Sequence, residues 1–283
     1  MRIAAFMQLR NELEKGNLRR CLDNCRQWAT DIFIYDDCSD DGSQSVYEEY
    51  TDRDKIILGE KPDFKNEIFH KDQLLKLALS VNPDWIVWQD GDAIMDRRIT
   101  EDCPAFLDKA GGHDGIKIHY MNLWRSESYF RLDNKFNGLH VIAFWRNNGS
   151  LRYDPRSGFH NDQFPLGMNR ILKLDDSHRI LHFGFSTLEQ ILQRYYLHIG
   201  YGESRESLHR IVDEESSFDL QKATKELYPS ENLPEGHGVA LPPRPISYRE
   251  LIKYNSWEEF CESQRGNGLL QQEIALLLHP END

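Results

Sequence analysis

Residues 32–43 of this 283-residue chain read IFIYDDCSDDGS, and residues 85–92 read WIVWQDGD. Each segment is an apolar run of four residues followed at once by an acidic turn. Short apolar runs bounded by turn residues are typical of buried strands in a mainly parallel sheet. Ligands of such sheets bind beyond the carboxyl ends of the strands. The two acidic turns are therefore expected to meet in one cleft, where their carboxylates could hold a divalent cation and, through it, phosphate.

Strands and helices are expected to alternate around these two segments. Apolar patterning predicts strands at 2–9, 32–35, 55–58 and 85–88, and helices at 13–28, 45–50 and 72–80. Further strands are expected at 116–120, 140–145 and 180–185, followed by a helix at 187–198. This order favours an α/β fold with a Rossmann-like, mainly parallel central sheet flanked by helices.

The regular alternation of strand and helix patterns ends near residue 203. Residues 241–245 read LPPRP, which predicts a stiff extended segment. We expect residues 1–202 to form the ligand-binding and catalytic domain. Residues 203–283 are expected to form a C-terminal helical and irregular extension that packs on this core.

Composition limits the possible partners. The formal net charge is -13, which disfavours sequence-independent binding to nucleic acid without excluding a local basic groove. No apolar stretch approaches the roughly 18 residues of a membrane span, and the N-terminus has the wrong flanks for a secretory signal. The five cysteines contain no C-x-x-C pair. These features predict reduced thiols and a cytoplasmic location.

The first acidic turn has two other interpretations. Asp, Ser and Gly are the residues that ordinary turns prefer. The pattern D-x-S-x-D-G over residues 37–42, followed by Glu48, also resembles the calcium loop of an EF-hand. An EF-hand needs a helix before its loop, whereas the β-branched and aromatic residues 32–35 favour a strand. A D-x-D sequence such as residues 90–92 is also common in turns.

Together, the two turns resemble those of family 2 glycosyltransferases of the GT-A fold. In that family the second strand typically ends in D-D-x-S-x-D-G-[ST], the pattern of residues 36–43, and the fourth strand ends in D-x-D, here residues 90–92. Arg10-Asn11-Glu12 follows the first strand as in the family's opening segment. The resemblance covers roughly residues 2–200. Cys38 and Gln89 depart from the pattern, because a small residue and an apolar residue are usual there.

The resemblance implies a nucleotide-diphosphate sugar donor, with a UDP-sugar favoured, and Mn²⁺ or Mg²⁺ as cofactor. Asp37 would accept a hydrogen bond from the imide N–H of the base. Asp90 would lie near the ribose and the metal, and Asp92 would ligate the metal directly. The other candidate donor contacts, from strand main chain, strand ends and a later helix, are Ala5, Gln8, Arg10, Lys71, Gly91 and Arg194.

An inverting sugar transfer also needs a base for the acceptor hydroxyl. The resemblance places this base on a loop after the D-x-D, where residues 158–165 read GFHNDQFP. Asp162 is the first choice and His160 the second, although Asp162 could equally cap a turn or a helix. Residues 180–185 read ILHFGF and resemble the family's H-[FY]-G motif, which suggests His182 as a further metal ligand. A histidine in an apolar strand is, however, ordinarily a core residue.

We therefore predict a metal-dependent, inverting glycosyltransferase that acts on a glycan, a lipid-linked sugar or another hydroxyl acceptor. Aromatic residues between the later strands could form an acceptor wall or simply pack in the core; they are Tyr120, Trp124, Tyr129, Phe130 and Trp145. A sugar-nucleotide nucleotidyltransferase is an alternative, but the segment after the first strand, QLRNE, lacks the glycine-rich phosphate loop of that class. A non-catalytic calcium- or sugar-binding module is the second alternative.

Overall fold

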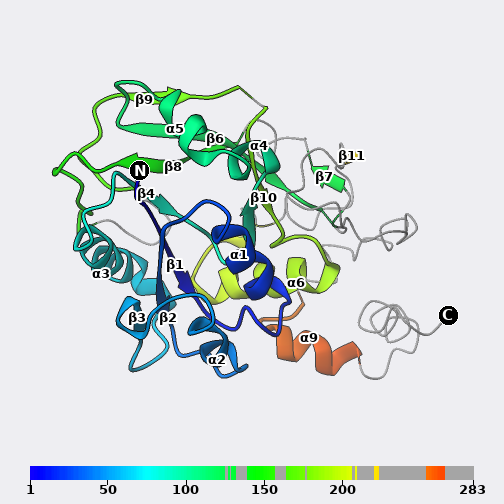
Figure 1. Ribbon diagram of the computed structural model, residues 1–283. Helices are drawn as coiled ribbons and strands as arrows, with labels where there is room; N and C mark the ends of the chain where they lie inside the picture. The colour runs from blue at the N-terminus through cyan, green and yellow to red at the C-terminus, as the bar shows by residue number, and fades with distance from the viewer. Residues whose placement is uncertain are drawn as a thin grey trace. The chain divides into compact units, whose positions relative to one another are not determined.

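The computed structural model describes residues 1–124, 127, 129–131, 139–156, 164–175, 177–205, 208, 220–222 and 253–264 (Figure 1). The chain divides into two compact units that alternate along the sequence. The first unit comprises Met1–Met121, Gly138–His182 and Thr224–Leu233, and the second comprises Asn122–Asn137, Phe183–Ala223 and Pro234–Asp283. The expected division into a domain at 1–202 and an extension at 203–283 stays a prediction.

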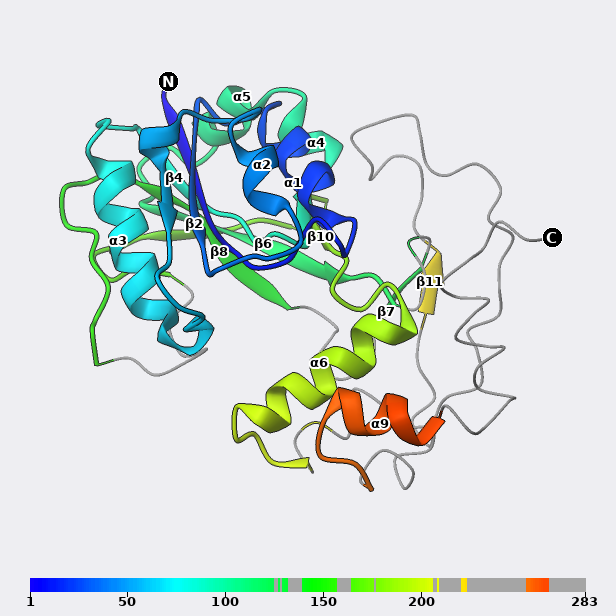
Figure 2. The ribbon, with the colours of Figure 1, turned by 90° about the horizontal axis from the view of Figure 1, so that it is seen from below.

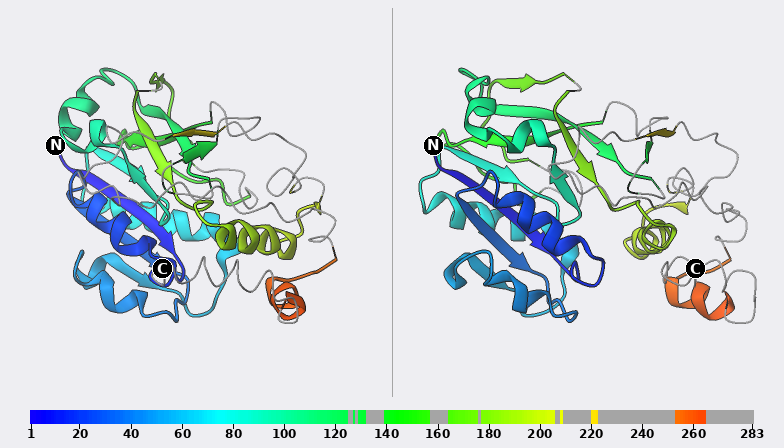
Figure 3. Two further views of the ribbon diagram at one scale, coloured as in Figure 1. Left: turned by 90° about the vertical axis from the view of Figure 1, so that its right-hand side faces the viewer. Right: turned by 45° about the vertical axis from the view of Figure 1, so that its right-hand side comes forward.

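The described part of the first unit is built on one nine-stranded sheet (Figures 1 and 3). Its order is β3-β2-β1-β4-β8-β6-β10-β5, with β9 paired to β6. The strands are β1 (Ile3–Leu9), β2 (Asp31–Asp36), β3 (Ile56–Leu58), β4 (Trp85–Trp88), β5 (Ala93–Met95), β6 (Gly115–Asn122), β8 (His140–Arg146), β9 (Ile171–Lys173) and β10 (Arg179–His182).

The sheet changes character at β4. Strands β3, β2, β1 and β4 run parallel to one another, whereas β8 is antiparallel to both β4 and β6, and β5 is antiparallel to β10. The parallel half therefore carries the carboxyl ends of β1, β2 and β4 at one edge. The two acidic turns of the sequence follow β2 and β4 at this edge.

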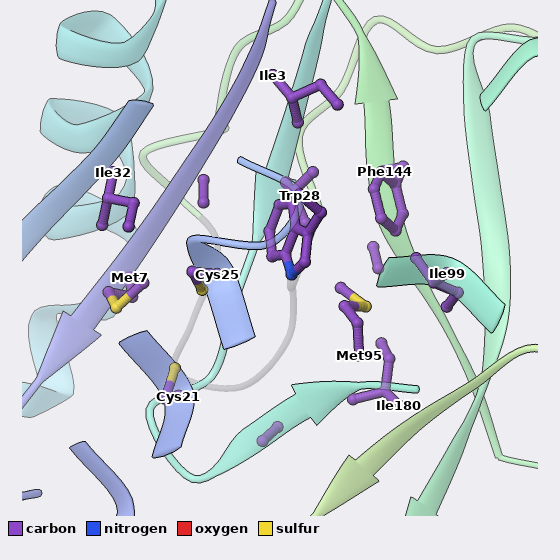
Figure 4. Packing of buried hydrophobic residues seen from close by; sticks show 14 of the residues in the cluster. Ile3, Met7, Cys21, Cys25, Trp28, Ile32, Met95, Ile99, Phe144 and Ile180 are labelled. Atoms are coloured by element: carbon purple, nitrogen blue, oxygen red, sulfur yellow. The ribbon is translucent and has the colours of Figure 1, made fainter. Parts of the chain in front are cut away.

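Helices cover both faces of the parallel half, which explains why β1 is apolar at nearly every position. Figure 2 shows α1 (Asn17–Cys25) and α2 (Ser43–Tyr47) on one side of β1 and β2, and α3 (Glu67–Leu79) on the other. Met7 of β1 belongs to the same buried cluster as Cys21, Cys25 and Trp28 on the α1 side (Figure 4). On the opposite face, Phe6 packs with Phe33 of β2 and with Leu74, Leu75 and Ala78 of α3.

The expected elements of the parallel half are confirmed, with shifted ends. Helix α1 begins at Asn17 rather than at residue 13, and α3 begins at Glu67 rather than at residue 72. Gly16, directly before α1, has a φ of 73°, in the left-handed region that favours glycine. Strand β10 ends at His182 rather than at residue 185. Within the first unit, the elements that patterning missed are β5, β9, the short helices α4 (Arg97–Thr100) and α5 (Cys103–Asp108), and the 3₁₀ turns Arg53–Lys55 and Phe64–Asn66.

In the second unit, α6 (Leu188–Gly200) packs on α9 (Trp257–Gln264) through Tyr196 and Phe260, whose ring centroids are 5.8 Å apart. Thr187 caps α6 in a reciprocal arrangement with Gln190. Strands β7 (Tyr129–Arg131) and β11 (Leu220–Lys222) form an antiparallel pair. No helix in the described part of the chain is long and apolar enough to cross a membrane.

Candidate functional site

The first acidic turn fastens two loops together through Asp41. One oxygen of its carboxylate, Oδ2, accepts hydrogen bonds from the N–H groups of Leu13 and Glu14, both at 2.9 Å, and Oδ1 accepts from the N–H of Ser43 at 2.9 Å. Burial raises the pKa of the Asp41 carboxyl, but the hydrogen bonds from Ser43, Glu14 and Leu13 outweigh it and hold the pKa below its ordinary value. The loop after β1 is therefore attached to the turn after β2.

Asp36 and Ser39 also bond within the protein. Asp36 is fully buried and accepts from the Ser39 N–H and the Gln44 side chain, each at 2.9 Å, and from the Tyr47 hydroxyl at 2.6 Å. The Ser39 hydroxyl oxygen accepts the N–H of Asn11 at 3.0 Å. The EF-hand interpretation is wrong, because strand β2 rather than a helix precedes the turn and these oxygens already have partners.

Asp37 differs from the other acids of the turn. Its Oδ1 accepts the N–H of Asp63 at 2.8 Å, but Oδ2 is buried without a hydrogen-bond partner. The Arg10 guanidinium lies 3.7 Å from Oδ2 and is itself 42% exposed. Burial raises the pKa of Asp37, and the Asp63 N–H and the charge of Arg10 oppose that rise. A buried acceptor without a partner calls for an explanation, and a ligand N–H would supply one.

Two more polar side chains near Asp37 lack partners. Gln8 on β1 is buried, and neither the nitrogen nor the oxygen of its side-chain amide has a hydrogen bond. It stands beside Tyr35 in the parallel register of β1 and β2. The His70 ring on α3 stacks on Tyr35 with centroids 4.0 Å apart, and its Nδ1 is also unpartnered. Burial lowers the pKa of His70, against the opposing charge of Asp37, which favours the neutral imidazole.

Two other candidate donor contacts, Lys71 and Ala5, are buried in the protein interior. Lys71 is 1% exposed, forms an ion pair with Glu67 one helical turn away and places its ammonium 4.3 Å from the centre of the Trp88 ring. Ala5 lies in the middle of β1, between Ile32 of β2 and Val87 of β4. In this structure Lys71 is thus held inside the protein rather than at its surface.

Aromatic donors anchor the second acidic turn. Asp90 accepts the indole N–H of Trp88 at Oδ1 and the hydroxyl of Tyr120 at Oδ2, both at 2.8 Å. The side-chain nitrogen of Gln89 donates to the carbonyl of Ala93 at 2.6 Å and to that of Asp90 at 3.0 Å. Gln89, unusual for the family at this position, therefore shapes the turn from inside.

Gly91 brings the second turn against the loop that the first turn holds. A Cβ at this position would lie 2.5 Å from Leu9 Cδ2 and 3.1 Å from Glu12 Cγ, so the absence of a side chain permits the contact. The Glu12 carboxylate bonds to Lys15 at 2.7 Å and to Asn17 at 3.1 Å. Residues 9–14 therefore contact both acidic turns, which brings the two turns to one place as expected.

Asp92 and His182 meet beside this loop. The distance from His182 Nε2 to Asp92 Oδ2 is 3.1 Å, because the antiparallel pairing of β5 with β10 sets His182 opposite Ala93. A carboxylate and an imidazole are ligands that Mn²⁺ accepts. No group of three or more His, Cys, Asp or Glu side chains suited to a metal occurs among the residues that the structure describes. The pair supplies two ligands, so a cation held there would need its others from phosphate oxygens or water.

Three further candidates lie outside the described residues or in the second unit. Asp162 and His160 lie outside the described residues. Arg194 belongs to α6 in the second unit, with its guanidinium 4.9 Å from the centre of the Phe185 ring. Trp124, in the same unit, is 1% exposed and stacks on Phe185 at 5.0 Å, which favours core packing over an acceptor wall.

Residues 5–173 match the family model described as Glycosyl transferase family 2, and the chain belongs to this family. It is a glycosyltransferase, and the expected GT-A type of α/β fold is confirmed. This assignment decides against the nucleotidyltransferase and the non-catalytic binding module. No curated protein has a sequence that matches the chain.

Several solved structures resemble this structure at low sequence identity. S. aureus TarS 1-349 superposes with a TM-score of 0.47 and 16% identity, over 75% of this chain and 69% of that one. The same protein in complex with UDP-GlcNAc gives a TM-score of 0.44 and 14% identity, over 76% and 71% of the two chains. The mannosyltransferase PcManGT from Pyrobaculum calidifontis, in complex with GDP-Man and Mn²⁺, gives 0.41 and 12%, over 71% and 64%.

Proposed function

We propose that this glycosyltransferase uses Mn²⁺ or Mg²⁺ to transfer a sugar, with inversion, from a nucleotide-diphosphate sugar to an acceptor hydroxyl. The observation that carries the proposal is the meeting of Asp92 with His182 next to the Asp90-Gly91 turn. Asp92 and His182 would hold the cation, with Asp90 beside them. When bound, the cation supplies a Lewis acid that takes up charge on the departing diphosphate.

Asp37 supports a uracil base in the donor. Its Oδ1 is already engaged by the Asp63 N–H at 2.8 Å, so one oxygen, Oδ2, remains without a partner. A single acceptor suits a base edge with one imide N–H, as uracil has, better than the two adjacent donors of guanine. The unpartnered amide of Gln8 offers both a donor and an acceptor to the same base. Arg10 would move off Asp37 when the base enters and could then contact the diphosphate.

The other candidate contacts remain part of the proposal. Lys71 would have to leave its ion pair with Glu67 to reach a diphosphate. Arg194 stays a candidate diphosphate contact. Asp162 is the proposed base for the acceptor hydroxyl, with His160 as second choice, so Asp162→Asn is expected to keep donor binding and lose transfer.

Calorimetric titration with UDP, GDP and CDP, with and without MnCl₂, tests the proposal. We expect UDP with Mn²⁺ to bind most tightly. Asp92→Ala should lose at least about tenfold in that affinity, because losing a direct metal ligand should cost at least as much as losing an orienting partner, typically 10–100-fold. Asp175→Ala removes a carboxylate that is 77% exposed and is the matched control. If wild type and Asp92→Ala bind every nucleotide equally weakly, the proposal fails.

A further inference from the structure

Tyr120 lies where the parts of the candidate site come together. From β6, its hydroxyl donates to Asp90 Oδ2 at 2.8 Å, and its ring centroid is 5.0 Å from that of His182 on β10. His182 in turn contacts Asp92, two residues from Asp90. One side chain thus contacts one carboxylate of the D-x-D turn and the imidazole partner of the other.

Asp90 is held from two strands at once. Trp88 of β4 donates to Oδ1, and Tyr120 of β6 donates to Oδ2. The Trp88 ring is itself fixed by an edge contact with Phe6 at 5.3 Å and by the Lys71 ammonium at 4.3 Å. A carboxylate with one donor on each oxygen cannot rotate freely, so its orientation is set before any ligand arrives.

A small cavity borders this arrangement. It has a volume of about 20 Å³ and is lined by Trp88, Gln89, Asp90, Tyr120, Val141, Ile142, Ala143 and Ile180. Such a volume holds about one water molecule. A water could therefore replace part of the Tyr120 hydroxyl's hydrogen bonding in a Phe variant, but it would not restore the fixed direction of the lost bond.

We propose that Tyr120 is a positioning residue for sugar transfer: its hydroxyl orients Asp90 and its ring packs against His182, so that Asp90, Asp92 and His182 are in place for the cation and the donor. This inference rests on the proposed function. Tyr120 acts through those three residues, and its role differs from that of the acceptor wall expected from the sequence.

The test is calorimetric titration of UDP into Tyr120→Phe, over a series of MnCl₂ concentrations and without metal. Loss of an orienting partner of a metal site typically costs 10–100-fold in metal affinity. We expect about a tenfold weaker Mn²⁺-dependent UDP affinity, recovery at higher Mn²⁺, and unchanged UDP affinity without metal. A purely structural role would weaken both affinities and would not respond to Mn²⁺.

Tyr50→Phe is the matched control, because the Tyr50 hydroxyl also donates to an aspartate, Asp23, at 2.8 Å on the outer side of α1. Trp88→Phe removes the second donor to Asp90 and is expected to behave like Tyr120→Phe. If Tyr120→Phe matches wild type at every Mn²⁺ concentration, the positioning role is overturned and the proposed function stands. If wild type shows no Mn²⁺-dependent UDP binding, the proposed function is overturned, and this inference with it.

Discussion

Replacing Asp41 tests whether the first acidic turn attaches the loop after β1. Asp41→Ala removes an acceptor for three main-chain N–H groups, those of Leu13, Glu14 and Ser43. The Leu13 N–H keeps a second partner, the Ser43 hydroxyl oxygen at 3.2 Å. Two bonds to a charged group are therefore lost outright. With water replacing them in part, each is worth about 1–1.5 kcal/mol, so the free energy of unfolding should fall by about 2–3 kcal/mol.

Urea unfolding at pH 7 measures this loss as a lower midpoint with an unchanged m-value. Asp41→Asn keeps one acceptor oxygen and should lose about half as much. In the folded protein the pKa of Asp41 lies below its ordinary value of 3.8. The ionised carboxylate therefore contributes its full stabilisation at pH values above 3.8, and this stabilisation is lost as the pH falls through the folded-state pKa. Measurements at pH 7 therefore report all of it.

Asp40→Ala is the control, because Asp40 is a neighbouring acid whose side chain accepts one exposed hydrogen bond, from Asn11 at 2.7 Å. It should lose about 0.5–1 kcal/mol. The loop also carries Arg10 and Glu12, so Asp41→Ala should weaken UDP binding as well. If Asp41→Ala destabilises the protein no more than Asp40→Ala does, the attachment inferred here is refuted.

Gly91→Ala would place a Cβ 2.5 Å from Leu9 Cδ2, so we expect a loss of about 1–3 kcal/mol in unfolding free energy and weaker Mn²⁺-dependent UDP binding. Gly200→Ala, at the end of helix α6, meets nothing within 4 Å and should not destabilise the protein. An unaffected Gly91→Ala would contradict the close packing. Burial raises the pKa of Asp96 to about 7, against the N–H groups of Arg179 and Ile99. The folded protein thus keeps a proton that the unfolded chain releases near pH 4. Stability should therefore fall as pH rises from about 4 to 7, by at most about 1.4 kcal/mol per pH unit. Urea unfolding between about pH 4 and 7 should show that the unfolding free energy depends less steeply on pH in Asp96→Asn than in wild type. An unchanged dependence on pH would show that Asp96 does not cause it.

Local patterning predicted the parallel half of the sheet well, because each strand there is an apolar run closed by turn residues. The start of α3 escaped prediction for a non-local reason. Its first turns contain Glu67, His70 and Lys71, polar residues that are buried by an ion pair, by stacking on Tyr35 and by the contact with Trp88. Hydropathy patterning predicts that such polar residues are exposed, so it does not predict a buried helix face there. Strand β5, three residues long, depends on its partner β10 and has no pattern of its own.

The sequence located the acidic turns but could not separate the roles of their carboxylates. Asp36, Asp37 and Asp41 share one chemistry, and the fold alone shows that Asp36 and Asp41 bond within the protein while Asp37 keeps an unpartnered oxygen. Tyr120 looked like one aromatic residue among several, because its partner Asp90 lies 30 residues away. The directions of side chains between strands cannot be read from spacing along the chain.

The contacts of the candidate site join residues at very different separations along the chain, which determines the order in which they can form during synthesis. The Asn11–Ser39 bond that joins the first two loops spans 28 residues, so the part of the site around Asp37 can form early. The Asp92–His182 contact spans 90 residues and must wait for β10. Closing the longer loop costs more chain entropy and is slower. In a nascent chain that has not yet reached His182, the loops around Asp37 can therefore already be joined, whereas the Asp92–His182 contact cannot yet form.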